Sequence, residues 1–265
     1  MSRYPRISSD TGIYHAILRG VNKQQIFECD EDYEQFVRIL MRQCGQIADL
    51  RPAEDRPNEL LLRQLRGEEE PEVERPERHC YIYAWCLLGN HVHLLIKGVG
   101  EEIGDVIKRI SSSYVYYYKH KYDRIGHLYQ ERFKSEPVED WDYFLTLLRY
   151  IHQNPLKPRL VKDLKDYPWS SWQEYLGMST RPFCSTAAVF KRISLKDLTD
   201  IVTKPMTENE EEGILEYEPK GKKNGFTDAD VWRMIETYSG ARNLSEFQKF
   251  DRPVLECEFQ LFHAA

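Results

Sequence analysis

Residues 80–97 read CYIYAWCLLGNHVHLLIK, in which two apolar runs flank the pair Gly89-Asn90. Glycine and asparagine tolerate the backbone angles of a tight turn, and apolar runs on both sides of such a pair are typical of a strand hairpin. Because both runs are apolar at nearly every position, we expect two strands that are central in their sheet.

Alternating strands and helices are predicted around this hairpin. Apolar spacing indicates, in chain order, a strand that ends in a turn within 12–26, a helix at 30–47 that Asp30 could cap, the hairpin at 80–97, a helix at 101–122, a fourth strand at 128–138 and a helix at 141–154. The order β, α, β, β, α, β, α is that of a ferredoxin-like, split βαβ arrangement. The predicted class is therefore α+β, an antiparallel sheet with helices on one face and the last helix added on the other.

Composition divides the chain into regions. Residues 51–79 hold nine acidic and six basic side chains with several prolines, which predicts a surface insertion without chemistry. We expect a main domain at 1–178 that contains this insertion. A linker and extension would follow at 179–225, and an incomplete small helical region at 226–265 would form a C-terminal helical extension.

The charge pattern leaves the kind of partner open. A net charge of -6 argues against a nucleic-acid partner, but residues 105–134 hold seven basic side chains against three acidic ones, together with seven aromatic rings. Positive charge interleaved with aromatic rings suits the binding of unstacked bases. The alternative is that these tyrosines belong to the core and the charges are merely solvated.

The sequence indicates a soluble, cytoplasmic protein without membrane contact. No run approaches the roughly 18 apolar residues of a membrane span, and Arg3, Pro5, Arg6 and Asp10 stand where a signal peptide would be apolar. The six cysteines form no CxxC pair, so we expect reduced thiols, with neither a zinc ribbon nor a disulfide framework.

The histidines His91 and His93 are the first candidate site residues. Side chains two residues apart on a strand point to the same face, so these two imidazoles would lie side by side while Val92 enters the core. Two neutral imidazoles suit a divalent first-row metal. They could equally be two incidental histidines near a turn.

The helix at 141–154 offers two further candidates. At about 100° per residue, Tyr150 and Asn154 lie one turn apart on a shared face. Asn154 could supply an amide oxygen as a third metal ligand, and Tyr150 a phenol. A packed tyrosine and an asparagine that caps the helix C-terminus would produce the same pattern.

Several motifs together resemble the REP-associated branch of the single-tyrosine HUH transposases. This family is insertion-sequence-200-like, and HUH means His, hydrophobic residue, His. The matching stretches follow one another in the family's order. The first runs from Tyr14-His15 through Arg19-Gly20 to Phe27, and the others are GNHVHLL at 89–95, GHLYQERFKS at 126–135, YIHQNP at 150–155 and YPWSS at 167–171. Tyr129 stands where the family has tryptophan, the insertion is longer than usual, and the helix-turn-helix of larger members would be incomplete here.

The resemblance implies a role for each candidate residue. Tyr150 would be the nucleophile, chosen from 17 tyrosines, and His91, His93 and Asn154 would bind Mg²⁺ or Mn²⁺. The expected activity is metal-dependent cleavage and transfer of single-stranded or hairpin DNA through a 5′-phosphotyrosine intermediate, as in transposition. The basic side chains that would hold the DNA backbone are Arg132, Lys134 and Arg124.

Other functions remain open at this point. A domesticated regulator that binds hairpin DNA or RNA without cutting would keep the fold and the basic surface. A metal hydrolase would use His91 and His93 with water as the nucleophile, and would form no covalent adduct. The oligomeric state is expected to be monomer or homodimer.

Overall fold

The structure is a computed structural model that describes residues 8–47, 77–207, 210–211 and 213–215. The chain divides into two compact units, residues 1–217 and 218–265, and all described residues belong to the first unit. The predicted small helical region at 226–265 and most of the insertion at 51–79 lie outside the described residues.

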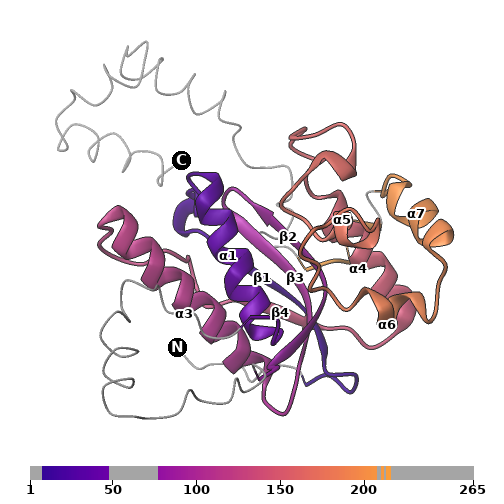
Figure 1. The fold of residues 1–265 in the computed structure, drawn as a ribbon, viewed down its shortest axis with the longest axis horizontal. Coiled ribbons are helices and arrows are strands. Elements are labelled where there is room, and N and C mark those ends of the chain that lie inside the picture. The colour runs from indigo at the N-terminus through magenta and orange to yellow at the C-terminus, as the bar shows by residue number, and fades with distance from the viewer. Residues whose placement is uncertain (1–7, 48–76, 208–209, 212, 216–265) are drawn as a thin grey trace, which may run out of the picture. The chain divides into compact units, whose positions relative to one another are not determined.

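The described part of the chain is built on a four-stranded antiparallel sheet (Figure 1). Its strands are β1 (Ile13–Arg19), β2 (Cys80–Leu88), β3 (His91–Gly98) and β4 (Lys134–Pro137), in the spatial order β2-β3-β1-β4. Each neighbouring pair of strands is antiparallel. The strands β1 and β2, which helix α1 separates in the sequence, are not neighbours, because β3 lies between them. This is the order of a ferredoxin-like split βαβ sheet, so the predicted fold class is confirmed.

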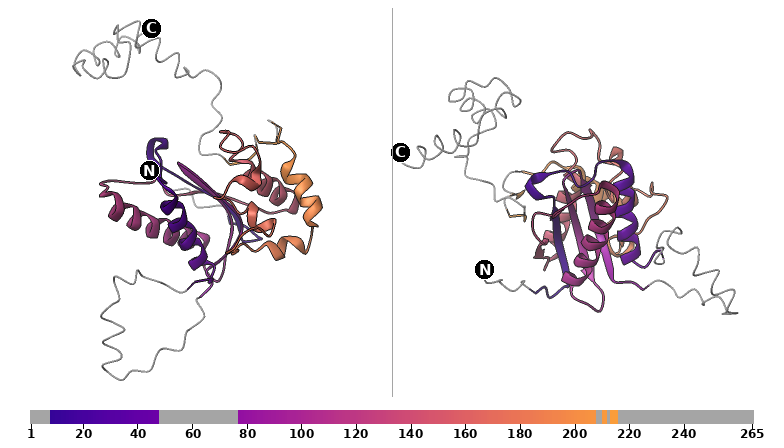
Figure 2. Two further views of the ribbon diagram at one scale, coloured as in Figure 1. Left: turned by 45° about the horizontal axis from the view of Figure 1, so that its top comes forward. Right: turned by 90° about the vertical axis from the view of Figure 1, so that its left-hand side faces the viewer.

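Helices cover both faces of the sheet (Figures 1 and 2). One face carries α1 (Asp30–Gln43) and α3 (Ile103–Tyr122), and the other carries α4 (Trp141–Gln153) with α5 (Trp172–Tyr175), α6 (Thr186–Phe190) and α7 (Leu195–Thr203). Two separate apolar clusters fill the two layers, because alternate strand residues point to opposite faces. The added helix is therefore α4, as predicted.

At the N-terminal end of the chain, the first strand ends in a turn as predicted, but the predicted cap of the first helix was wrong. The strand ends at Arg19, and Asn22 and Lys23, in the 3₁₀ turn η1 (Val21–Lys23), have φ angles of 50° and 59° that no strand can accommodate. Asp30 does not cap α1. The N-cap is Cys29, and the Asp32 carboxylate accepts hydrogen bonds from the amides of Glu28 and Cys29 at 2.7 and 3.2 Å.

The fourth strand is shorter than predicted. It spans Lys134–Pro137 instead of 128–138. The residues before it are joined to the end of β1 by an isolated bridge between Gly20 and Tyr129 and by a hydrogen bond from the amide of Gln130 to the carbonyl of Arg19 at 2.9 Å. The amide of Val21 donates to the carbonyl of Leu128 at 3.0 Å, so this connection runs along the chain that leaves β1. It therefore lies beside the end of the sheet where His91 begins β3.

The range 179–225, predicted as a linker and extension, contains packed helices in its described part. The side chain of Gln153 donates to the backbone carbonyls of Val202 and Lys204 at 2.6 and 2.7 Å. The guanidinium of Arg149 donates to the same carbonyl of Lys204 at 2.8 Å. Leu198 and Val202 are fully buried against the α4 layer. Residues of α7 thus belong to the same core as α4. No helix within the described ranges is long and apolar enough to cross a membrane.

Candidate metal and nucleophile site

His91 and His93 lie on one face of β3, the face covered by α4. Their rings are 5.0 Å apart between centroids, and His93 is only 3% exposed. In the register of the sheet, His91 is opposite Arg19 and His93 is opposite Ile17. Because β3 is hydrogen-bonded on both sides, by β2 and β1, the backbone that carries the two imidazoles is held firmly.

Helix α4 brings Tyr150 against this pair. Asp140 caps the helix by accepting the amide of Tyr143 at 2.7 Å, and a stripe of buried apolar residues fixes its rotation on the sheet. The Tyr150 ring centroid lies 5.6 Å from that of His93, edge to face, and the residue is 2% exposed. The fold therefore brings His93 and Tyr150 into contact, although 57 positions separate residue 93 from residue 150 in the sequence.

Asn154 is the C-cap of α4 and is 5% exposed. Its side-chain nitrogen donates to the carbonyl of Tyr150 at 2.9 Å, which leaves the amide oxygen as the atom able to accept or to bind a cation. Asn154 is thus both a helix cap and a neighbour of Tyr150. The cap interpretation and the ligand interpretation are compatible with the same geometry.

The two histidines are in the neutral form that a metal ligand requires. Burial, reinforced by the positive charges of Arg19 and Lys157, lowers the pKa of His91 to about 4. Burial also lowers the pKa of His93 well below its ordinary value, with further contributions from neighbouring His91 and His15. Both rings therefore keep a lone pair on one nitrogen at neutral pH.

The donor set fits a divalent ion. Among the residues that the structure describes, no three His, Cys, Asp or Glu side chains are grouped so as to hold a metal. A third protein ligand would thus have to come from another residue type, such as the amide oxygen of Asn154. Two imidazoles and one amide oxygen are neutral and leave positions for phosphate oxygens, which suits Mn²⁺ or Mg²⁺.

Two cations near the site were missed by sequence reasoning. The Lys157 ammonium lies 4.2 Å from the centroid of the Tyr150 ring and 3.1 Å from the carboxylate of Glu211. Arg19 is the cross-strand partner of His91, and its charge acts on that imidazole. The pairing of the first strand with the HVH strand would have identified Arg19. Lys157 comes after Pro155, where helical spacing no longer applies.

The three predicted DNA-binding residues occupy different environments. Lys134 begins β4 and pairs with Ile17, which in turn pairs with His93, so all three side chains point to the α4 face. Arg124 donates to the side chain of Gln24 at 2.8 Å and to the carbonyl of His127 at 3.2 Å. Arg132 is exposed in the connection before β4. Sheet register thus brings Lys134 toward the site, while the roles of all three stay predictions.

The tyrosines of α3 are mostly structural, as the core alternative held. Tyr114 is fully buried and its hydroxyl donates to the carbonyl of Ile26, while the Tyr118 hydroxyl donates to Glu28 at 2.8 Å. Tyr116, by contrast, is 68% exposed. The aromatic run at 114–118 therefore offers little surface for stacking bases.

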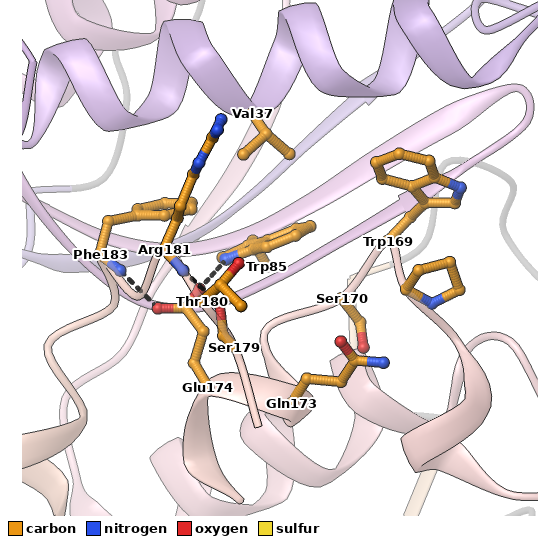
Figure 3. A pocket seen from close by; sticks show the side chains of 11 residues that line it. Val37, Trp85, Trp169, Ser170, Gln173, Glu174, Ser179, Thr180, Arg181 and Phe183 are labelled. Atoms are coloured by element: carbon orange, nitrogen blue, oxygen red, sulfur yellow. Dashed lines mark hydrogen bonds between the residues drawn. The ribbon is translucent and has the colours of Figure 1, made fainter. Parts of the chain in front are cut away.

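A separate pocket lies on the other side of β2 and contains none of the candidate residues (Figure 3). It is lined by Trp85, Trp169, Glu174 and Phe183, among others, with Val37 from α1. The Glu174 carboxylate accepts the indole NH of Trp85 at 2.9 Å and the amide of Phe183 at 2.6 Å. Glu174 is thus fully used in joining β2 to the chain after α5, so the pocket has a structural explanation.

Comparison with known proteins finds a family model that covers this part of the chain. Residues 74–154 match the family model described as "Transposase IS200 like". This segment contains His91, His93, Tyr150 and Asn154, together with β2, β3, α3 and α4. The resemblance stated from the sequence motifs is therefore confirmed, because the family-model match covers the residues of the candidate site.

One solved structure is similar to this chain. It is described as the "Structure of the REP associates tyrosine transposase bound to a REP hairpin", with 18% identity and a TM-score of 0.46, covering 69% of this chain and 90% of the other. A search of curated proteins finds no match.

Proposed function

We propose that this protein is a metal-dependent endonuclease and strand transferase for single-stranded or hairpin DNA, with Tyr150 as the nucleophile. The observation that carries the proposal is the contact of the Tyr150 ring with His93, 5.6 Å between centroids, with Asn154 one helical turn further on. The family match supports it because the matched residues include His91, His93, Tyr150 and Asn154.

The phenol is poised by its surroundings. A tyrosine with a pKa near 10 is a weak nucleophile at neutral pH and needs help at the scissile phosphate. When bound by His91, His93 and Asn154, Mg²⁺ or Mn²⁺ would polarise that phosphate and stabilise the charge of the transition state. Tyr150 is held by α4, so its hydroxyl would attack with little loss of orientational freedom.

The proposed step conserves the energy of the phosphodiester. The Tyr150 oxygen forms a bond to phosphorus while the bond from phosphorus to the 3′-oxygen breaks. The phenol proton passes to solvent, and the departing 3′-oxygen takes up a proton. The products would be a 5′-phosphotyrosine and a free 3′-hydroxyl. Attack by another 3′-hydroxyl would reverse the step and join strands without a nucleotide cofactor.

The side chain of Lys157 covers the Tyr150 ring, so we expect that the DNA reaches the phenol by displacing this side chain. Tyr150 is 2% exposed, and the Lys157 ammonium lies over its ring. We expect the phosphate to take the place of this contact and to draw the ammonium to its own oxygens. Lys134, Arg132 and Arg124 would then contact the backbone further along the strand.

Formation of a covalent adduct tests the proposal. The protein is incubated with single-stranded and hairpin oligonucleotides and Mn²⁺, and a denaturant-resistant protein-DNA band is sought. We expect the band with the wild type, none with Tyr150→Phe, and a normal band with Tyr118→Phe, a buried tyrosine of α3. An adduct with Tyr150→Phe would overturn the choice of nucleophile.

The other candidate functions give different results in the same assay. Binding of hairpin DNA or RNA that is insensitive to EDTA, without any adduct, would indicate a regulator that no longer cuts. Cleaved product without an adduct would indicate a hydrolase that uses water.

A further inference from the structure

A hydrogen-bonded chain stands behind His93. His15 of β1 is fully buried, its Nδ1 lies 2.8 Å from a carboxylate oxygen of Glu136 on β4, and its Nε2 lies 3.1 Å from Nδ1 of His93. The planes of the two imidazoles are nearly parallel, with an angle of 14° between them. Three adjacent strands, β4, β1 and β3, thus contribute one residue each to a continuous line of contacts.

Donor and acceptor chemistry gives this line a direction. A carboxylate can only accept hydrogen bonds, so Nδ1 of His15 must carry the proton that it donates to Glu136. In a neutral His15, Nε2 is then an acceptor, and Nδ1 of His93 must be the donor to it. A neutral His93 with its proton on Nδ1 keeps the lone pair on Nε2. That nitrogen is then the one available to a metal.

His91 is held in the same tautomer by a different contact. Its Nδ1 faces the side-chain oxygen of Asn90, and Asn90 donates from its nitrogen to the carbonyl of Lys23 at 3.1 Å. The amide nitrogen of Asn90 is therefore used elsewhere, and its oxygen accepts from His91. Both histidines of the HVH motif have Nδ1 occupied and Nε2 available, although the residues behind them differ.

Glu136 is itself fixed by two further contacts. The amide of Leu215 donates to the same carboxylate oxygen at 3.2 Å. The hydroxyl of Tyr143 also donates to Glu136, an interaction that, after burial, helps to raise the pKa of that tyrosine. A glutamate that receives hydrogen bonds from β1, from α4 and from the chain at Leu215 has little freedom to turn away from His15.

We propose that His15 and Glu136 are positioning residues that fix the tautomer and the orientation of His93 for metal binding. The proposal rests on the metal site of the proposed function, but it concerns residues that neither touch the metal nor react. Partners of this kind typically change metal affinity by about 10- to 100-fold. Register supports the assignment, since His15 and Glu136 are directly opposite each other in β1 and β4.

The first test measures the tautomer of each histidine in the metal-free protein. Nitrogen-15 NMR of labelled histidine distinguishes a proton on Nδ1 from one on Nε2, and it requires neither metal nor DNA. We expect both His91 and His93 of the wild type to carry the proton on Nδ1. In Glu136→Gln the amide can donate to His15 and reverse the chain, so the Nε2-protonated form of His93 should appear while His91 stays unchanged.

The second test measures Mn²⁺ affinity by electron paramagnetic resonance without DNA. We expect Glu136→Gln and His15→Phe to weaken binding by at least about tenfold. The matched control is Glu139→Gln, which removes a carboxylate that, within the described part of the chain, accepts hydrogen bonds from the amides of Asp10 and Thr11. Glu136→Asp, which keeps the carboxylate, should recover part of the affinity.

The outcomes separate this proposal from the proposed function. If His93 of the wild type carries its proton on Nε2, or if Glu136→Gln and His15→Phe bind Mn²⁺ normally while His93→Ala does not, the positioning role is wrong and the metal site stands. If the wild type binds no Mn²⁺ at all, the metal site fails, and the NMR result still decides whether the chain sets the tautomer.

Discussion

Both faces of the sheet carry buried tyrosines, but the side chains around these tyrosines differ. On the α1 and α3 face, the tyrosine hydroxyls donate to Ile26, Glu28 and Asp32, and are thereby tied into the fold. On the α4 face, Tyr150 is equally buried but packs against imidazole rings and beneath a lysine ammonium. Burial alone therefore does not separate a structural tyrosine from a candidate nucleophile. The chemistry of the neighbours does.

Among the substitutions considered, removal of one imidazole should have the largest effect, a loss of adduct formation on the α4 face. His91→Ala is expected to reduce adduct formation by about a thousandfold, because the metal would lose a ligand and the phosphate its Lewis acid. EDTA should reduce the wild type to the same level. His120→Ala, a change on α3 with no connection to the site, serves as the control. An unchanged rate in His91→Ala would remove this residue from the metal site.

Removal of Asp32 should affect the opposite face and leave the chemistry intact. Its carboxylate caps α1 and accepts hydrogen bonds from Lys121 at 2.8 Å and from Tyr122 at 2.7 Å. Asp32→Ala should lower the free energy of unfolding by about 2–4 kcal/mol, because the cap and the charged pair are lost together. Urea denaturation measures this, and adduct formation per folded molecule should not change.

Replacement of Lys157 should have a smaller effect, confined to the α4 face. Lys157→Ala is expected to slow adduct formation by about tenfold, since one cation beside the phosphate is lost. Lys157→Arg should retain most of the rate. Because the Lys157 side chain is 35% exposed, the urea midpoint of Lys157→Ala should match the wild type. A faster reaction would show that Lys157 only blocks access to the phenol.

Acid should destabilise the α1 face through Asp32, and this is the smallest of the expected effects. Burial alone would raise the pKa of Asp32, but hydrogen bonds from Lys121 and Tyr122 outweigh it and lower the pKa below its ordinary value. A depressed pKa stabilises the folded state above the unfolded-state pKa near 4, and this stability is lost as pH falls through the folded-state pKa. In Asp32→Asn that part of the pH dependence should disappear from urea midpoints measured between about pH 5 and pH 2.

Hydropathy predicted most of the fold because each strand and helix repeats its pattern over many residues. The run at 80–97 forms β2 and β3 as expected, and α4 begins at Trp141 as predicted. Of these two strands only β3 is central, however, because β2 lies at one edge of the described four-stranded sheet. Predictions failed where single residues decide, as at Asp30, which does not cap α1 because the Asp32 carboxylate accepts the amides before the helix. Helix α7 was missed because its contacts with Arg149 and Gln153 depend on tertiary structure.

Sequence by itself determined which residues are candidates for the centre of the site. Strand periodicity placed His91 and His93 on one face, helix periodicity placed Tyr150 and Asn154 on another, and the family motifs joined them. Only the tertiary structure decided what surrounds them. Arg19, Lys157, His15 and Glu136 come from β1, from the turn after α4 and from β4. Sequence periodicity acts along one element, whereas these contacts depend on strand register and helix packing between elements that are distant in the chain.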